Sequence, residues 1–130
     1  MKQKNTISSA EVVTRYIFEK SHYARTKNNI KYRSFLPRNG ETSIFRINNL
    51  GDKPIWDIGE NYVAIISART LLARGDLIAS DIFEEGLEIK SDTREHKLHA
   101  NIVGWPLGER AKIIFLATNL ADKAQLHLKP

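Results

Sequence analysis

The stretch His99–Ala124, HANIVGWPLGERAKIIFLATNLADKA, carries the most regular pattern in this chain. Residues 99–104 are predicted to form a short buried strand, and Trp105 and Pro106 mark the corner that follows it. Beyond the corner, apolar residues recur at the spacing that lines one face of a helix: Ile113, Leu116, Ala117, Leu120, Ala121 and Ala124. The stretch therefore predicts a strand, a corner and one long amphipathic helix packed on a core.

Shorter elements are predicted on both sides of this stretch. Downstream, residues 125–129 alternate as a final edge strand. Upstream, strands are predicted over 87–90 and 69–74, the latter closed by Gly75 and Asp76, and a charged loop over 91–98. A single helical turn from Ser80 to Glu85 is predicted to end at Gly86, which accepts a left-handed backbone.

The first half of the chain contains two predicted helices and one predicted hairpin. Ser8 and Glu11 fit a capping box, so a helix is expected over 9–20, although its residues also form strands well. Strands over 30–36 and 42–48 are expected to pair as a hairpin. A second helix begins near Asp52, with its apolar face at Ile55, Ile58, Tyr62, Ile65 and Ile66. The order of elements predicts an α+β fold: a mixed or largely antiparallel sheet with two or three helices mainly on one face.

Length and composition limit the class of protein. A chain of 130 residues fits a single domain over residues 1–130, with residues 1–7 expected to be a flexible tail. There is no cysteine, hence no disulfide and no cysteine-based metal site. Without an apolar leader or an apolar run of about 20 residues, a cytoplasmic location without membrane contact is expected.

Charge is distributed unevenly along the chain. Residues 1–40 contain nine Lys or Arg against two acids, whereas the remaining residues carry a slight excess of acids. Such asymmetry favours a polyanion or an acidic protein surface as partner, the alternative being a solvated basic surface. The candidate residues for contact with nucleic acid, preferably single-stranded, interleave cations with an aromatic ring: Arg25, Lys27, Lys31, Arg33, Phe35 and Arg38.

Two further groups are candidates for catalysis. His99, at the start of the buried strand, is a candidate general base with Asn101 beside it, against the alternative of a structural histidine. Arg46, Arg69 and Arg74 each lie in an apolar stretch. They are expected either to form buried ion pairs or to converge as an anion clamp. No metal site and no cofactor are predicted.

Two tryptophans and an acidic run complete the candidates. Trp56 and Trp105 are interface anchors if exposed, and Trp105 is otherwise a core plug. An acidic run extends through Asp76, Asp81, Glu84, Glu85, Glu88, Asp92 and Glu95. Most of these carboxylates are expected to face water or to complement the basic first third.

Three functional hypotheses follow. The first is a small non-catalytic accessory module of a larger bacterial-type assembly, whose basic third contacts nucleic acid or an acidic protein, with a protein partner expected. The second is a His-dependent hydrolase or transferase acting on a phosphate-bearing substrate. The third is an immunity or inhibitor protein that uses the acidic run as its contact face. The sequence predicts no oligomeric state.

Overall fold

The computed structural model describes residues 7–130, so the predicted tail over 1–7 lies outside the described residues except for Ile7. In chain order the elements are β1 (Val12–Ile17), η1 (Lys20–His22), β2 (Tyr23–Ala24), β3 (Asn29–Ile30), η2 (Tyr32–Phe35), β4 (Thr42–Arg46), α1 (Asp52–Ile58), η3 (Gly59–Val63), α2 (Ala64–Ser67), β5 (Ala73–Ile78), α3 (Ala79–Phe83), β6 (Glu88–Ser91), β7 (His99–Val103), α4 (Arg110–Lys123) and β8 (Gln125–Leu128). Here η1 and η2 are 3₁₀ turns and η3 is a π-helical turn.

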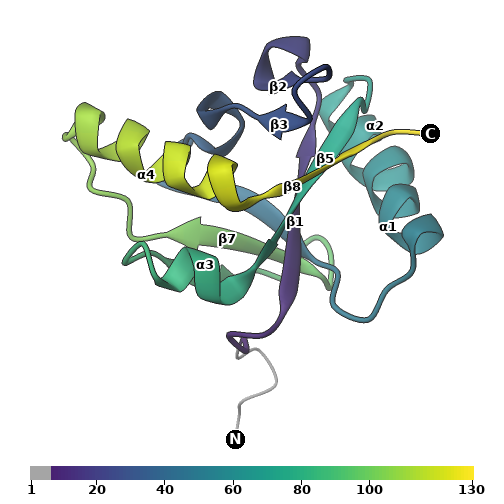
Figure 1. The fold of residues 1–130 in the computed structure, drawn as a ribbon. Helices are drawn as coiled ribbons and strands as arrows, with labels where there is room; N and C mark the ends of the chain where they lie inside the picture. Colours follow the sequence, from purple (N-terminus) through teal and green to yellow (C-terminus); the bar gives the residue numbers. More distant parts are fainter. Residues whose placement is uncertain (1–6) are drawn as a thin grey trace, which may run out of the picture.

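One antiparallel sheet organises the described part of the chain (Figure 1). Its strand order is β6-β7-β4-β1-β5-β8, and β2 pairs with β3 in a separate small hairpin. Every pair of neighbouring strands is antiparallel. The predicted α+β class with a largely antiparallel sheet is confirmed.

Helical segments cover both faces of this sheet. Val13 and Ile17 of β1 belong to a large core cluster with Leu120 of α4, whereas Tyr16 of β1 packs in a second cluster with Ile55 of α1. Successive side chains of a strand point to opposite faces, so the two clusters lie on opposite sides of the sheet. Figure 1 shows α4 and the α1–α2 segment on either side of β1 and β5. Helices were predicted mainly on one face of the sheet. Helices α3 and α4 lie on that face, whereas the α1–α2 segment covers the other.

The predicted helix over 9–20 is wrong, because β1 occupies the middle of the sheet between β4 and β5. Glu11 does not complete a capping box; its carboxylate binds the guanidinium of Arg46, with Oε2 2.5 Å from Nε. Val12, Val13 and Thr14 are β-branched residues, which pack well on a pleated surface. Pairing with two neighbouring strands therefore outweighs the local helix signal.

The predicted hairpin of strands 30–36 and 42–48 is also wrong, because β4 pairs with β1 and β7 instead. After Ile30 the chain turns into η2, whose Ser34 and Phe35 are buried. Side chains of the sheet hold this turn: Arg15 Nε donates to the carbonyl of Ser34 at 2.8 Å, and Thr42 Oγ1 donates to that of Phe35 at 2.9 Å. These bonds satisfy carbonyls that a strand would have paired with a neighbour.

The strand predicted over 69–74 is displaced, since β5 runs from Ala73 to Ile78 and includes the expected terminators Gly75 and Asp76. Gly75 is required by packing: a Cβ there would lie 2.4 Å from Cδ1 of Ile30. Asp76 is tolerated because Thr14 Oγ1 donates to its Oδ1 at 2.7 Å. Gly75 and Asp76, which usually end a strand, are therefore accommodated inside β5 by contacts with distant segments of the chain.

The other predicted helices and strands are present, and the short β2–β3 hairpin forms over residues 23–30, where a loop was expected up to residue 29. The helix begins at Asp52, with Gly51 rather than Asp52 at the N-cap, and continues through the π-helical turn to α2. Its predicted apolar face is only partly covered, since Ile65 and Ile66 are 69% and 61% exposed. Gly86 has a positive φ of 81°, as expected for the end of α3. The strand, corner and long helix of the opening stretch are confirmed as β7, Trp105–Pro106 and α4.

Candidate functional site

The arginines predicted as an anion clamp do not converge. Arg46 binds Glu11, and Arg74 binds Asp76 and Asp52, with N–O distances of 3.1 and 3.2 Å. Arg69 lies elsewhere, above the ring of Phe18. Arg46 and Arg74 therefore match the ion-pair interpretation of the sequence, and Arg69 alone opens into a basic pocket.

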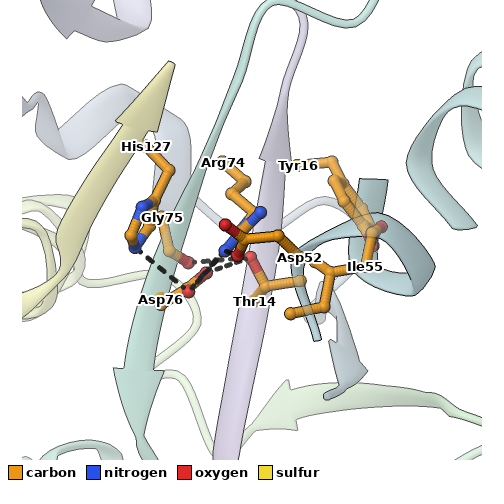
Figure 2. Close-up of polar contacts among 8 residues, drawn as sticks. All are labelled: Thr14, Tyr16, Asp52, Ile55, Arg74, Gly75, Asp76 and His127. Atoms are coloured by element: carbon orange, nitrogen blue, oxygen red, sulfur yellow. Dashed lines mark hydrogen bonds and ion pairs between the residues drawn. The ribbon is translucent and has the colours of Figure 1, made fainter. Parts of the chain in front are cut away.

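Arg74 is the centre of a buried polar network on the α1 face of the sheet (Figure 2). The residue is 2% exposed, and its guanidinium lies 4.7 Å from the ring centroid of Trp56. Asp76 also receives Thr14 Oγ1 and lies 3.4 Å from Nε2 of His127. This network places cation, carboxylate and hydroxyl in mutual contact, which is how a buried charge is accommodated.

Four other arginine positions define a concave basic site, here called the arginine pocket. Arg15, Arg33, Arg38 and Arg69 line a cavity of about 420 Å³ together with His22 and Phe18. None of the described residues that line it is acidic. Within residues 7–130, Arg69 has one ion pair here, to Glu19 at 3.9 Å, and Arg15, Arg33 and Arg38 have no salt bridge.

The charge of the arginine pocket is concentrated rather than neutralised. Arg15 uses Nε and Nη1 to donate to the backbone carbonyls of Ser34 and Ser43, at 2.8 and 2.9 Å. Carbonyl oxygens satisfy the donors but carry no net charge. Burial, with repulsion from Arg69 and Arg38, lowers the pKa of the Arg15 guanidinium to about 10. Such a cavity attracts an anion, because guanidinium groups pair bidentately with phosphate and carboxylate.

The residues predicted to contact nucleic acid are divided by the structure. Arg33 and Arg38 line the arginine pocket, whereas Arg25 and Lys27 are exposed in the turn of the β2–β3 hairpin. Lys31 and Arg33 also line a neighbouring hollow of about 250 Å³ beside α4. Phe35 is fully buried in the core and cannot stack on a base, so that residue is removed from the predicted set.

His99 opens into a second cavity, of about 400 Å³, here called the histidine pocket. Its Nε2 lies 2.8 Å from Oγ of Ser43, and its Nδ1 lies 3.0 Å from the backbone carbonyl of Asp92. A carbonyl only accepts, so Nδ1 carries the proton of the neutral ring and Nε2 accepts from the Ser43 hydroxyl. The carboxylate Oδ2 of Asp92 is 4.0 Å from Nδ1. Ser43, His99 and Asp92 therefore form a row, with the imidazole ring between the hydroxyl and the carboxylate.

Charged and aromatic neighbours fix this arrangement. Hydrogen bonding to Arg94 lowers the pKa of the Asp92 carboxyl to about 2, which keeps that carboxylate ionised. The rings of His96 and His99 each stand edge-on to Phe45, with centroids 5.3 Å away. Burial, with the charges of His99 and Lys97, lowers the pKa of His96. Asn101, predicted as a partner of His99, is buried two residues along β7 and is absent from the described lining of the pocket.

The two pockets share a wall. Ser43, Phe45 and Val63 line both the arginine pocket and the histidine pocket. Ser43, whose hydroxyl bonds His99, thus lines the same cavity as the four arginines. Sequence analysis missed Ser43 and Arg15, since Ser43 lies 56 residues from His99 and Arg15 was placed in a helix.

The positions of the two tryptophans and of the acidic run do not indicate a further site. Trp105 is 5% exposed and donates from Nε1 to the carbonyl of Ile102, so it fills the core and is not an exposed interface anchor. Trp56 is half-buried, and the guanidinium of Arg74 lies over its ring. The acidic run is dispersed: Asp76 and Asp92 pair with arginines, and Lys123 binds both glutamates that follow α3. Four of its seven carboxylates, those of Asp76, Glu84, Glu85 and Asp92, are therefore paired with cations.

Comparison with known proteins gives no relative. No protein-family model matches the chain, and no curated protein and no solved structure is significantly similar to it. Within residues 7–130, no group of three or more His, Cys, Asp or Glu side chains is arranged to hold a metal ion. No helix among these residues is long and apolar enough to span a membrane. The two pockets are therefore the features of this protein that indicate a function.

Proposed function

We propose that this protein binds single-stranded nucleic acid by its phosphates, through the arginine pocket. The observation that carries the proposal is the convergence of Arg15, Arg33, Arg38 and Arg69 on one cavity without an acidic residue in its described lining. Phosphate is an anion that such clustered guanidinium groups recognise well, since each can donate two parallel hydrogen bonds.

Stacking surfaces beside the cations favour nucleic acid over an acidic protein. Arg69 lies over the ring of Phe18, 4.6 Å from its centroid, and Arg33 lies 5.4 Å from that of Tyr32. Guanidinium planes and aromatic rings are the platforms on which unpaired bases stack. An acidic peptide could pair with the arginines but has no nucleobase to stack on these rings and guanidinium planes.

The shape of the basic surface favours a single strand. Arg33 lines both the arginine pocket and the neighbouring hollow, whose lining also includes Lys31 and the acidic Asp122, so the two adjoin at this residue. A flexible strand can place one phosphate in the cavity and the next along this hollow. The stiff backbone of a duplex cannot fold into a cavity of about 420 Å³.

Fluorescence anisotropy with a labelled single-stranded oligonucleotide tests this proposal. Arg33→Ala and Arg69→Ala change exposed side chains and should leave the fold intact, and Arg110→Ala, exposed at the start of α4, is the matched control. We expect salt-sensitive binding, weakened at least tenfold by the double variant and unchanged by the control. Each lost phosphate contact should reduce the slope of log K against log salt by about 0.7.

Two competitors extend the test to other ligands. A duplex of the same length and a poly-glutamate peptide should compete weakly for the site. No binding at low salt, equal loss with Arg110→Ala, or equal competition by poly-glutamate would each refute the proposal.

A further inference from the structure

We propose that Ser43 and His99 cleave a phosphodiester of the strand held in the arginine pocket. This inference rests on the proposed function, because the arginine pocket supplies the substrate. The hydroxyl of Ser43 is 2.8 Å from Nε2 of His99 and lines the same wall as the arginines. No other described serine hydroxyl is hydrogen-bonded to a histidine.

The orientation of His99 suits a general base. The carbonyl of Asp92 accepts the Nδ1 proton at 3.0 Å, which leaves the Nε2 lone pair directed at the Ser43 hydroxyl. When the ring takes up a second proton, the carboxylate of Asp92, 4.0 Å from Nδ1, stabilises the cation. Asp92 acts through His99 and is a positioning residue, whereas Ser43 and His99 are the catalytic residues.

The neighbouring charges select phosphoryl over acyl transfer. Acyl transfer usually relies on backbone N–H groups that hold an oxyanion, and Ser43 lies within the part of β4, Thr42 to Phe45, that pairs with β7. Phosphoryl transfer instead needs cations beside the non-bridging oxygens of the phosphate. Arg15 donates to the backbone carbonyl of Ser43 at 2.9 Å, so a guanidinium lies beside the residue that carries the nucleophile.

The reaction proceeds in two displacements. Ser43 Oγ attacks phosphorus in line with the bond to the leaving sugar oxygen, its proton passes to Nε2 of His99, and that phosphorus–oxygen bond breaks as the sugar oxygen takes a proton from solvent water. The enzyme then carries the remaining strand as a phosphodiester on Ser43. The hydroxide left by that water attacks phosphorus from the side that the sugar has vacated, and the Ser43 oxygen leaves as it regains its proton from Nε2 of His99. The net reaction consumes one water and converts a diester into a monoester and an alcohol.

A fluorophosphonate probe tests the nucleophile, because its phosphorus accepts Ser43 Oγ and releases fluoride, with the proton taken up by His99. Mass spectrometry of the intact protein and of its peptides should find one adduct, on Ser43. Ser43→Ala should abolish it, and His99→Gln should slow it at least about 100-fold, as expected for loss of a general base. Ser67→Ala is the matched control: Ser67 lines the same histidine pocket, but its hydroxyl donates to the carbonyl of Val63 at 2.8 Å.

A labelled single-stranded oligonucleotide tests the substrate. Denaturing gels should show cleaved product and a covalent protein–oligonucleotide species, both missing with Ser43→Ala, while circular dichroism confirms that each variant folds. Wild-type protein that binds the oligonucleotide without labelling or cleavage overturns this inference and leaves the proposed function standing. Labelling without binding refutes the proposed function, and with it the phosphodiester substrate. Labelling that Ser67→Ala reduces as much as Ser43→Ala also overturns the assignment.

Discussion

Replacing Arg74 with methionine should lower the free energy of unfolding by about 3–5 kcal/mol, because it leaves a carboxylate without its cation inside the protein. Arg74 is 2% exposed and Asp76 has a side chain 14% exposed, so water cannot replace the lost partner. The change also removes the contact with the ring of Trp56. Figure 2 shows Thr14 and His127 as the groups left around Asp76.

Urea unfolding followed by tryptophan fluorescence measures this loss. With a slope of about 1–3 kcal/mol/M, a loss of about 4 kcal/mol lowers the midpoint by more than about 1 M. Asp52→Asn is the matched control, since Asp52 also bonds Arg74 but is 83% exposed at its side chain, and exposed pairs are worth about 1 kcal/mol or less.

A double variant separates charge from packing. Arg74→Met combined with Asp76→Asn should be more stable than Arg74→Met alone, because no unpaired carboxylate remains and Thr14 keeps an acceptor. A loss below about 1 kcal/mol for Arg74→Met, or an equal loss for Asp52→Asn, would refute the assigned role of the buried pair.

Two further predictions concern pH and packing. Burial is the main cause that lowers the pKa of both His22 and His96 in the folded protein. The unfolded chain therefore takes up protons first as pH falls below about 6.5, and the free energy of unfolding should decline there. Urea midpoints measured between pH 8 and 5 should fall for the wild-type protein and fall less for a His22→Gln, His96→Gln variant. Gly59→Ala should destabilise by about 1–3 kcal/mol despite the better helix propensity of alanine, since the new Cβ would lie 2.8 Å from the ring of Tyr16. Gly51→Ala meets no atom closer than 3.9 Å, and its cost should stay at or below about 1 kcal/mol, because Gly51 is the N-cap of α1 and alanine is the poorer cap. Equal shifts of the thermal midpoint for the two glycines would contradict this reasoning.

Local pattern was a good guide in the second half of the chain and a poor one in the first. The strand and helix within His99–Ala124 were predicted because their apolar periodicity, corner and polar outer face agree. The segment 9–20 carried a capping signal, yet it became β1 because β4 and β5 pair on both sides of it. Similarly, Phe35 was expected on a strand surface but is buried beneath α4 in a 3₁₀ turn.

The candidate site was predicted only in part. His99, Arg33, Arg38 and Arg69 were singled out by residue type, and the structure places all four in one or other of the adjoining pockets. Ser43 was not singled out, because a serine on a strand has no distinguishing sequence context. Its partner lies on a different strand, and their contact depends on the register in which Phe45 opposes His99.

The sequence by itself determined the α+β class, the excess of basic residues in the first third, and the strand and helix of the opening stretch. These properties depend on composition and on periodicity within about 25 residues. Tertiary structure alone decided that Arg15 joins arginines from three other segments, and that Arg46 and Arg74 bind carboxylates whereas Arg15, Arg33 and Arg38 have no salt bridge among residues 7–130. The reason is physical: charge is neutralised or concentrated by distances of a few ångströms between residues far apart in the chain, and only strand pairing and packing set those distances.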